Sequence, residues 1–159
     1  MSKEKKTVFI IGGSGGIGKE VSLKYGQEGY NLVVQGSSLE KLQELKNQFE
    51  KTKKPQQTIE LLPISFGKEK ISKKDMDQLK KYLEQSEILV ICFGPFLQKE
   101  IHNTTEEEWE SLVYWNYTFP GELISFALNF MMKNQFGRIV VFGGTFNPFH
   151  IGHYQMLNA

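Results

Sequence analysis

The stretch that decides the fold is TVFIIGGSGGIG, residues 7–18. Its first five residues are apolar or β-branched, which predicts a strand buried on both faces of a sheet. After the glycines, Ile17, Val21 and Tyr25 follow at a four-residue spacing, which predicts a helix with one apolar face. Glycines between a strand and a helix allow a tight turn and let backbone N–H groups approach a pyrophosphate at the helix N-terminus. The stretch therefore predicts a turn that binds a dinucleotide.

Outward from this stretch, short apolar runs alternate with segments of helical pattern. We expect four more strands, at residues 31–35, 58–64, 87–93 and 138–142. We expect helices to begin at polar caps, namely Ser37 with Glu40, Ser72 with Asp75, and Thr105 with Glu108, the last one continuing to about Asn134. Strands joined by crossovers of helical length form right-handed βαβ units. The sequence thus predicts an α/β fold: a doubly wound, Rossmann-like parallel sheet in three αβα layers.

The length of 159 residues suits one domain, and we expect a single NAD(P)-binding domain over residues 1–159. A sheet that ended at the fifth strand would leave an unpaired edge. We therefore expect the C-terminal part of the fold to be missing from this chain.

The composition excludes several classes of protein. The chain has 19 Lys and Arg residues against 18 Asp and Glu, a formal net charge of +1, which argues against a nucleic-acid partner. Because no apolar run approaches the roughly 20 residues of a membrane span, we expect no membrane partner. Cys92 is the only cysteine and has no internal disulfide partner, which indicates a cytoplasmic protein.

Several motifs together resemble the short-chain dehydrogenase/reductase family. Residues 11–18 are similar to that family's Thr-Gly-x-x-x-Gly-Ile-Gly loop, with Ile11 in place of threonine. Residues 88–95 fall where the family has Asn-Asn-Ala-Gly, and Gly94 keeps its glycine. The family's later signature is matched in order and spacing by Trp109–Leu112, Asn116 and Gly137–Val140. The resemblance covers about residues 7–145.

This resemblance implies an oxidoreductase that transfers hydride between a nicotinamide cofactor and a carbonyl or alcohol on a small-molecule substrate. The cofactor-binding residues that it implies are Gly12, Gly13, Ser14, Gly15, Gly16, Ile17, Gly18, Ser37, Ser38, Phe93 and Gly94. It also implies that the protein forms homo-oligomers, which are common in the family. The substrate itself is not readable from this sequence.

The end of the second predicted strand indicates which nicotinamide cofactor is bound. An acidic residue there would hold the ribose 2′-hydroxyl of NAD, but the sequence reads Gln-Gly-Ser-Ser over residues 35–38. The hydroxyls of Ser37 and Ser38, with Lys41 nearby, suit a 2′-phosphate, which favours NADP(H) over NAD(H). The alternative is that both serines only cap the next helix. Ser65 stands where the family places an aspartate near the adenine.

Asn116 is the candidate catalytic residue. Trp109, Val113 and Asn116 share one helical face, so we expect Asn116 on an inward apolar stripe, where it needs hydrogen-bond partners. Pro120 has no N–H to offer the Asn116 carbonyl and is expected to kink the helix. In the family that this chain resembles, the asparagine at this position belongs to the catalytic set and orders a water molecule. The alternative is a core asparagine that ties the helix to the sheet.

The family's catalytic tyrosine and lysine are not matched. The family has a serine after the fifth strand and a lysine four residues after its tyrosine, whereas this chain has Gly143 or Gly144 beside Thr145, then Tyr154 followed by Asn158. Two explanations stay open: a fragment that stops before the catalytic pair, or a non-catalytic NAD(P)-binding protein. In both, the chain itself is expected to be inactive.

A second resemblance lies in the tail. Residues 143–153 are similar to the start of the adenylyltransferases that act on nicotinate mononucleotide, where Gly-Gly-Thr-Phe-Asp/Asn-Pro precedes a pair of histidines. Two explanations stay open: a coincidental match where a strand runs into a glycine turn, which we favour because the match covers about eleven residues, or the start of an adenylyltransferase-like domain at residues 143–153. Histidines placed like His150 and His153 stabilise transferring phosphates in that family. The same two histidines have no further ligand spaced to join them, so we expect no metal site.

Overall fold

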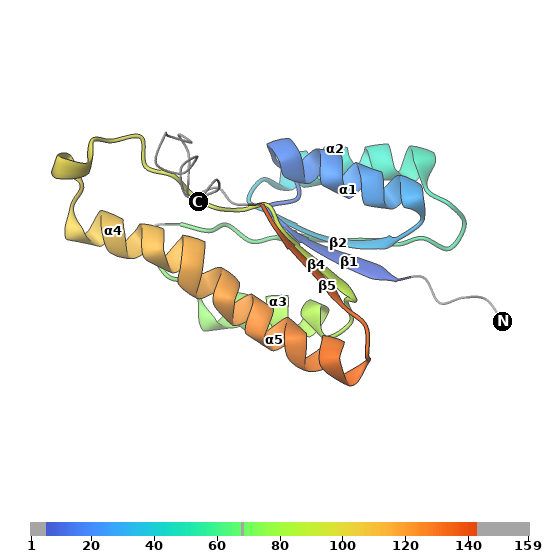
Figure 1. Ribbon diagram of the computed structural model, residues 1–159. Coiled ribbons are helices and arrows are strands. Elements are labelled where there is room, and N and C mark those ends of the chain that lie inside the picture. The colour runs from blue at the N-terminus through green and yellow to red at the C-terminus, as the bar shows by residue number, and fades with distance from the viewer. Residues whose placement is uncertain (1–5, 68, 143–159) are drawn as a thin grey trace, which may run out of the picture.

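The computed structural model describes residues 6–67 and 69–142, in which five parallel strands form one sheet (Figure 1). The strands are β1 (Thr7–Ile11), β2 (Asn31–Gly36), β3 (Ile59–Pro63), β4 (Ile88–Ile91) and β5 (Arg138–Val141). Their order across the sheet is β3-β2-β1-β4-β5, so β1 lies between β2 and β4. The chain moves one way from β1 to β3 and the other way from β1 to β5, as the doubly wound prediction requires.

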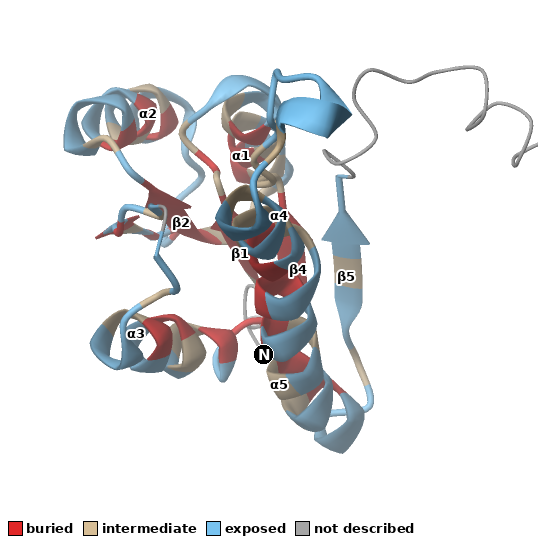
Figure 2. Cartoon of the chain, turned by 90° about the vertical axis from the view of Figure 1, so that its left-hand side faces the viewer, coloured by how far each residue is buried: buried red, intermediate tan, exposed pale blue. Residues whose placement is uncertain are grey.

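Helices cover both faces of the sheet (Figure 2). On one face lie α1 (Gly16–Glu28) and α2 (Leu39–Thr52). On the other lie α3 (Lys73–Leu83) and a long helical rod made of α4 (Glu106–Val113), a π-helical turn (Tyr114–Thr118) and α5 (Phe119–Lys133). Because alternate strand residues point to opposite faces, Val8 and Ile10 pack with the α2 side while Phe9 and Ile11 pack with the α5 side. This arrangement confirms the three-layer αβα fold.

Side-chain caps begin α2, α3 and α4, with one correction to the prediction. Ser38, and not Ser37, is the N-cap of α2, because its Oγ accepts the Lys41 N–H at 3.3 Å. The predicted capping box of Ser37 with Glu40 is therefore wrong by one residue. Ser72 caps α3 as expected.

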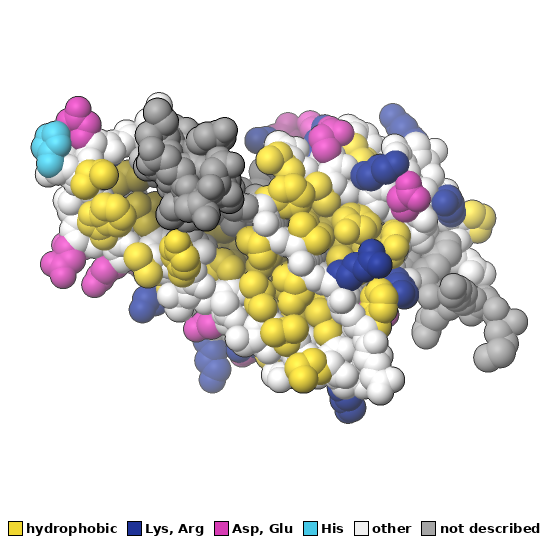
Figure 3. Space-filling model, in the orientation of Figure 1, with side chains coloured by type: hydrophobic (Ala, Val, Ile, Leu, Met, Phe, Trp, Pro, Cys, Tyr) yellow, Lys and Arg dark blue, Asp and Glu magenta, His cyan; other side chains and the backbone are white. Residues whose placement is uncertain are grey.

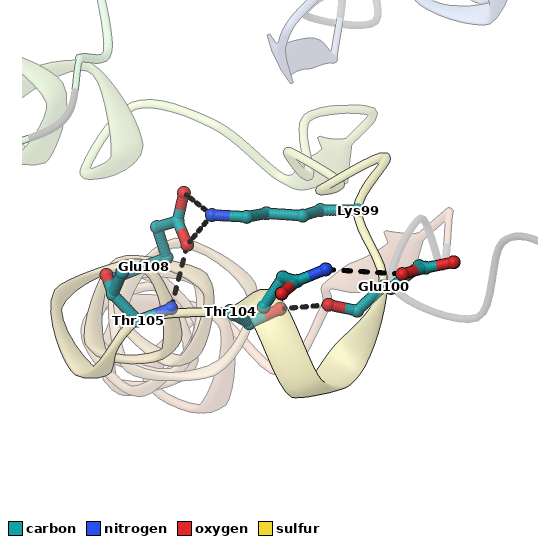
Figure 4. Close-up of polar contacts among 6 residues, drawn as sticks. Lys99, Glu100, Thr104, Thr105 and Glu108 are labelled. Atoms are coloured by element: carbon teal, nitrogen blue, oxygen red, sulfur yellow. Dashed lines mark hydrogen bonds and ion pairs between the residues drawn. The ribbon is translucent and has the colours of Figure 1, made fainter.

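The predicted capping box at the start of α4 is confirmed. The Glu108 N–H donates to Thr105 Oγ1 at 3.3 Å. The Thr105 N–H donates to Glu108 Oε2 at 2.8 Å (Figure 4). Lys99 Nζ lies 2.9 Å from the same carboxylate oxygen. This ion pair links the loop after β4 to the first turn of α4, so the cap fixes where that loop ends.

The rod from α4 to α5 widens into a π-helical turn where we expected a kink. The Phe119 N–H donates to the Tyr114 carbonyl, five residues earlier, and Pro120 follows directly. Proline has no N–H to continue the regular four-residue pattern. The wider turn accommodates it inside one continuous helical region.

The edge strand β5 is largely exposed, with its solvent-facing side visible in Figure 2. Figure 3, in the orientation of Figure 1, shows hydrophobic side chains gathered in the middle of that face of the molecule. In and directly after β5, the exposed apolar residues are Val140, Val141 and Phe142. Across the described ranges, no helix is both long enough and apolar enough to span a lipid bilayer.

Candidate nucleotide-binding site

The glycine loop forms one wall of a cleft of about 380 Å³ at the carboxyl ends of β1, β2 and β4. The residues that line it are Gly12, Ser14, Gly15, Gly16, Ile17, Gly18, Gln35, Gly36, Ser37, Lys41, Phe66, Cys92 and Phe93. The cleft opens where the chain reverses direction across the sheet, which is where open α/β sheets bind ligands. Most of the predicted cofactor-binding residues are therefore brought together in one cleft.

Three predicted residues do not line the cleft. Gly13 lies beneath the loop, where an added Cβ would come within 2.5 Å of Val34 Cγ1. Ser38 is occupied as the cap of α2. Gly94 follows Phe93 in the loop after β4 and is absent from the lining.

Two of the glycines are required by the packing of the loop itself. Gly12 has a φ of 74°, a left-handed conformation that favours glycine, and an added Cβ would lie 3.1 Å from the Cys92 carbonyl carbon. An added Cβ at Gly18 would collide with the Gly12 carbonyl oxygen. Both glycines let the start of α1 approach the ends of β1 and β4 closely.

Gly15 and Gly16 differ from Gly12 and Gly18, because the packing of the loop does not require glycine at either position. A Cβ added at either position would meet no atom within 4 Å. Gly15 has an extended φ of −104°, which any residue adopts. Both positions line the cleft, so a side chain there would occupy space that is open to a ligand. These glycines keep a cradle free at the N-terminus of α1.

The N-terminus of α1 suits an anion. Lys19 is the first residue whose N–H reaches a helical acceptor, the Gly15 carbonyl at 2.9 Å. The preceding N–H groups of the first turn have no acceptor within the helix, and the helix dipole adds partial positive charge there. An open cradle bordered by such N–H groups fits the pyrophosphate of a dinucleotide.

The end of β2 and the start of α2 determine the charge at the other end of the cleft. Ser37 and Lys41 both line the cleft, and both are exposed. The lining contains no carboxylate among the described residues. Lys41 therefore gives this part of the cleft a net positive character.

Phe93 is held at the cleft by an aromatic cluster. Its ring lies 4.8 Å from that of Phe66 and 5.6 Å from that of Trp115, both in edge-to-face geometry. Phe119 packs against Phe66 and Trp115 at 4.9 Å and 5.1 Å. The cluster joins the ends of β3 and β4 to the π-helical turn and fixes the wall of the cleft opposite the glycine loop.

Asn116 lies on a different face from the one we expected. Trp109 and Val113 are 45% and 50% exposed, so the predicted inward stripe is wrong. The buried face instead carries Trp115, Phe119 and Leu123. The sequence has apolar residues at helical spacing on both faces, and periodicity alone selected the wrong one.

The Asn116 side chain joins the helix to the loop after β4. Its Nδ2 donates to the Pro95 carbonyl at 2.9 Å and to the Leu112 carbonyl at 3.0 Å. Asn116 does not line the cleft. Its side-chain amide therefore anchors the segment that follows Phe93.

Four residues of the cleft were not singled out as site residues by the sequence analysis: Gln35, Gly36, Phe66 and Cys92. Burial raises the pKa of the Cys92 thiol to about 11, so this thiol is protonated at neutral pH. Gln35 is 2% exposed. A glutamine inside an otherwise apolar buried strand is the signal that could have identified it.

Several predicted residues lie outside the described ranges: the tail motif 143–153 with His150 and His153, and Tyr154 with Asn158. Within the described ranges, no three His, Cys, Asp or Glu side chains gather as a metal site would require.

The sheet order and the glycine cleft at its switch point define a Rossmann-like α/β protein. A family model described as short chain dehydrogenase matches residues 6–148. The chain belongs to the short-chain dehydrogenase family.

Curated relatives and a solved structure agree with this assignment. An uncharacterized oxidoreductase of Staphylococcus aureus (strain MW2) is 24% identical over 139 residues, covering 85% of this chain and 56% of the relative. The 3-oxoacyl-(acyl-carrier-protein) reductase of Buchnera aphidicola is 25% identical over 158 residues, covering 99% of this chain and 62% of the relative. A short-chain dehydrogenase from Sphingobium yanoikuyae, solved with NADPH, superposes with a TM-score of 0.78 at 22% identity, covering 95% of this chain and 59% of that one. The chain thus spans little more than half the length of these proteins.

Proposed function

We propose that this chain is the NADP(H)-binding part of an oxidoreductase that acts on a carbonyl or alcohol carbon of a small molecule. The observation that carries the proposal is the open cradle at Gly15 and Gly16, beside the free N–H groups of α1. Membership of the short-chain dehydrogenase family and the NADPH in a structural neighbour support it. When bound, the nicotinamide supplies a hydride donor or acceptor.

The chain's own residues would divide the binding between them. The N–H groups from Ser14 to Gly18 would hold the pyrophosphate, and the backbone of Gly12 and Gly13 would support the turn beneath it. Phe93 and Gly94 would border the nicotinamide-side ribose. The exposed Ile17, at the start of α1, would cover the pyrophosphate from the solvent side.

Selectivity for NADP(H) over NAD(H) would come from the end of β2. Ser37 and Lys41 line the cleft without a carboxylate beside them, so a 2′-phosphate meets a hydroxyl and a cation there. Ser38 would contribute through its N-terminal position in α2 and not through its hydroxyl, which already caps the helix. A ratio of NADPH to NADH dissociation constants near one would remove this part of the proposal.

Asn116 would order a water through its main chain. Its side-chain nitrogen is engaged by two carbonyls, and Pro120 offers the Asn116 main-chain carbonyl no N–H at the regular four-residue spacing. That carbonyl is an acceptor on which a catalytic water can be held. We propose the role on this geometry and on the family's use of the asparagine.

A second candidate is a non-catalytic NADP(H)-binding protein, which the pairing of Tyr154 with Asn158 in place of lysine favours. One experiment separates the two. Titration of the purified chain with NADPH, followed by nucleotide fluorescence, tests binding, and NADPH oxidation by the complete protein with a panel of ketones and aldehydes tests turnover. Binding by the chain with turnover by the complete protein supports the enzyme, binding without turnover by the complete protein supports the second candidate, and absence of binding overturns both.

We further propose that residues 1–159 fold as a single domain, that the protein is cytoplasmic, and that it forms a homo-oligomer. The free thiol of Cys92 supports a reducing compartment. Trp109, Val113 and Tyr117, exposed along one side of the rod, support association. Light scattering coupled to size-exclusion chromatography tests the oligomeric state, and a monomer at micromolar concentration would contradict the proposed homo-oligomer.

A further inference from the structure

Gln35 is a buried side-chain amide that connects two walls of the cleft. It lies near the end of β2 and is 2% exposed. Its Oε1 accepts the Gly12 N–H at 2.9 Å, and its Nε2 donates to the Ile64 carbonyl just after β3. A backbone N–H can only donate and a carbonyl can only accept, so these two partners fix the orientation of the amide.

The main chain of Gln35 also accepts a hydrogen bond from the next residue of the glycine loop. The Gly13 N–H donates to the main-chain carbonyl of Gln35 at 2.9 Å. From the other side, Ser22 Oγ in α1 lies 3.1 Å from the Gly13 carbonyl oxygen. The base of the loop is thus held at consecutive peptide groups. The N–H groups that face a ligand begin at Ser14, and among them the Gly15 N–H makes only a long contact of 3.5 Å to the Gly12 carbonyl.

The hydrogen bond from the Gly12 N–H to the Gln35 side chain forms at the residue of the loop that has a left-handed backbone conformation. Gly12 has the left-handed φ of 74°, and a Cβ added there would lie 3.1 Å from both the Cys92 carbonyl carbon and the Phe93 nitrogen. A rotation of this peptide would change the direction in which the next N–H groups of the loop point. Without the amide, the Gly12 N–H and the Ile64 carbonyl would lose their partners, which favours such a rotation.

We infer that Gln35 is a positioning residue of the nucleotide site. Its side-chain amide holds the first glycine of the loop so that the N–H groups from Ser14 onward face a bound diphosphate, and it couples this loop to the end of β3. The inference rests on the proposed function, since it concerns the same cleft. Gln35 itself forms no part of the hydride-transfer chemistry.

The test replaces Gln35 by methionine, which keeps the length of the side chain and removes both hydrogen bonds. The matched control is Gln57→Met. Gln57 is also buried, at 3% exposure, and its Nε2 donates to the Gly26 and Tyr30 carbonyls at 2.9 Å and 2.6 Å, at the amino end of β3 and away from the cleft. Thermal unfolding and NADPH titration are measured on the wild-type chain and both variants.

We expect both variants to unfold at a lower temperature. Only Gln35→Met should weaken NADPH, by roughly tenfold, the factor that corresponds to one net hydrogen bond of about 1.4 kcal/mol. Equal affinity in Gln35→Met and the wild type would overturn the inference, as would an equal loss in Gln57→Met. A wild-type chain that does not bind NADPH would instead overturn the proposed function.

A second measurement needs no variant and decides the matter if Gln35→Met does not fold. In the ligand-free wild-type chain, amide hydrogen exchange by NMR should show the Gly12 N–H protected and the Gly16 N–H unprotected. Adding NADPH should protect Gly16 and leave Gly12 unchanged. A Gly12 amide that exchanges as fast as Gly16 in the ligand-free chain would show that Gln35 does not hold it.

Discussion

Replacing Gly16 with alanine should change the stability of the ligand-free protein and its affinity for NADPH in opposite directions. Gly16 is the first residue of α1, and a Cβ built there meets no atom within 4 Å. Its φ lies outside the left-handed region. Alanine therefore fits without strain and restricts the unfolded chain, which stabilises the fold by about 0.4–1 kcal/mol. For a protein of this size, that raises the melting temperature by roughly 1–4 °C.

The effect on binding has the opposite sign because the added methyl group points into the cradle. A diphosphate displaced by this methyl group loses one of its hydrogen bonds to the N–H groups of α1, each worth roughly 1.5–3 kcal/mol because the acceptor is charged. We therefore expect the dissociation constant for NADPH to rise by about tenfold to a hundredfold. Fluorescence titration measures this, and differential scanning calorimetry measures the stability.

Two other glycines provide the controls. Gly121, in α5, also has no atom within 4 Å of an added Cβ, so Gly121→Ala should raise the melting temperature similarly and leave NADPH affinity unchanged. Gly18→Ala should lower the melting temperature, because its Cβ would collide with the Gly12 carbonyl. If Gly16→Ala bound NADPH as tightly as the wild type, the cradle would not be where the diphosphate lies.

Three further outcomes follow from the same structure. Lys41→Glu should weaken NADPH by about tenfold and leave NADH within twofold, because the reversed charge faces only the 2′-phosphate; parallel titrations with both nucleotides check it. Thr105→Ala should cost about 1 kcal/mol of stability through loss of the capping box with Glu108, measured by urea unfolding. Cys92 should react slowly with iodoacetamide at pH 8, with a rate that keeps rising toward pH 11 because burial raises its pKa to about 11, and NADPH should slow the reaction by covering the cleft.

The fold was predictable because the two strands in the middle of the sheet, β1 and β4, are apolar runs, and the other strands carry shorter apolar runs between segments of helical pattern. The four β1 residues from Val8 to Ile11 are fully buried, which is the environment that such a run requires. The glycine spacing after β1 also predicted the turn that lines the cleft. Both features are local in sequence, and local patterns need no knowledge of the partner elements.

The features that the sequence did not predict depend on contacts between distant residues. The face of α4 that carries Trp109 has the same apolar spacing as the buried face, and only packing against the sheet decides between them. Gln35 reaches Gly12 and Ile64, 23 and 29 residues away, and no spacing rule connects them. The capping error at Ser37 is smaller, since two adjacent serines compete and the helix begins after the second.

The measurement that tests the central claim most directly is an NMR titration of the ¹⁵N-labelled wild-type chain with NADPH. The account predicts saturable shifts of the amide resonances of Ser14, Gly15, Gly16, Ile17 and Gly18, with those at the exposed edge strand β5 unchanged. A folded chain whose glycine-loop resonances stay in place at millimolar NADPH would contradict the account.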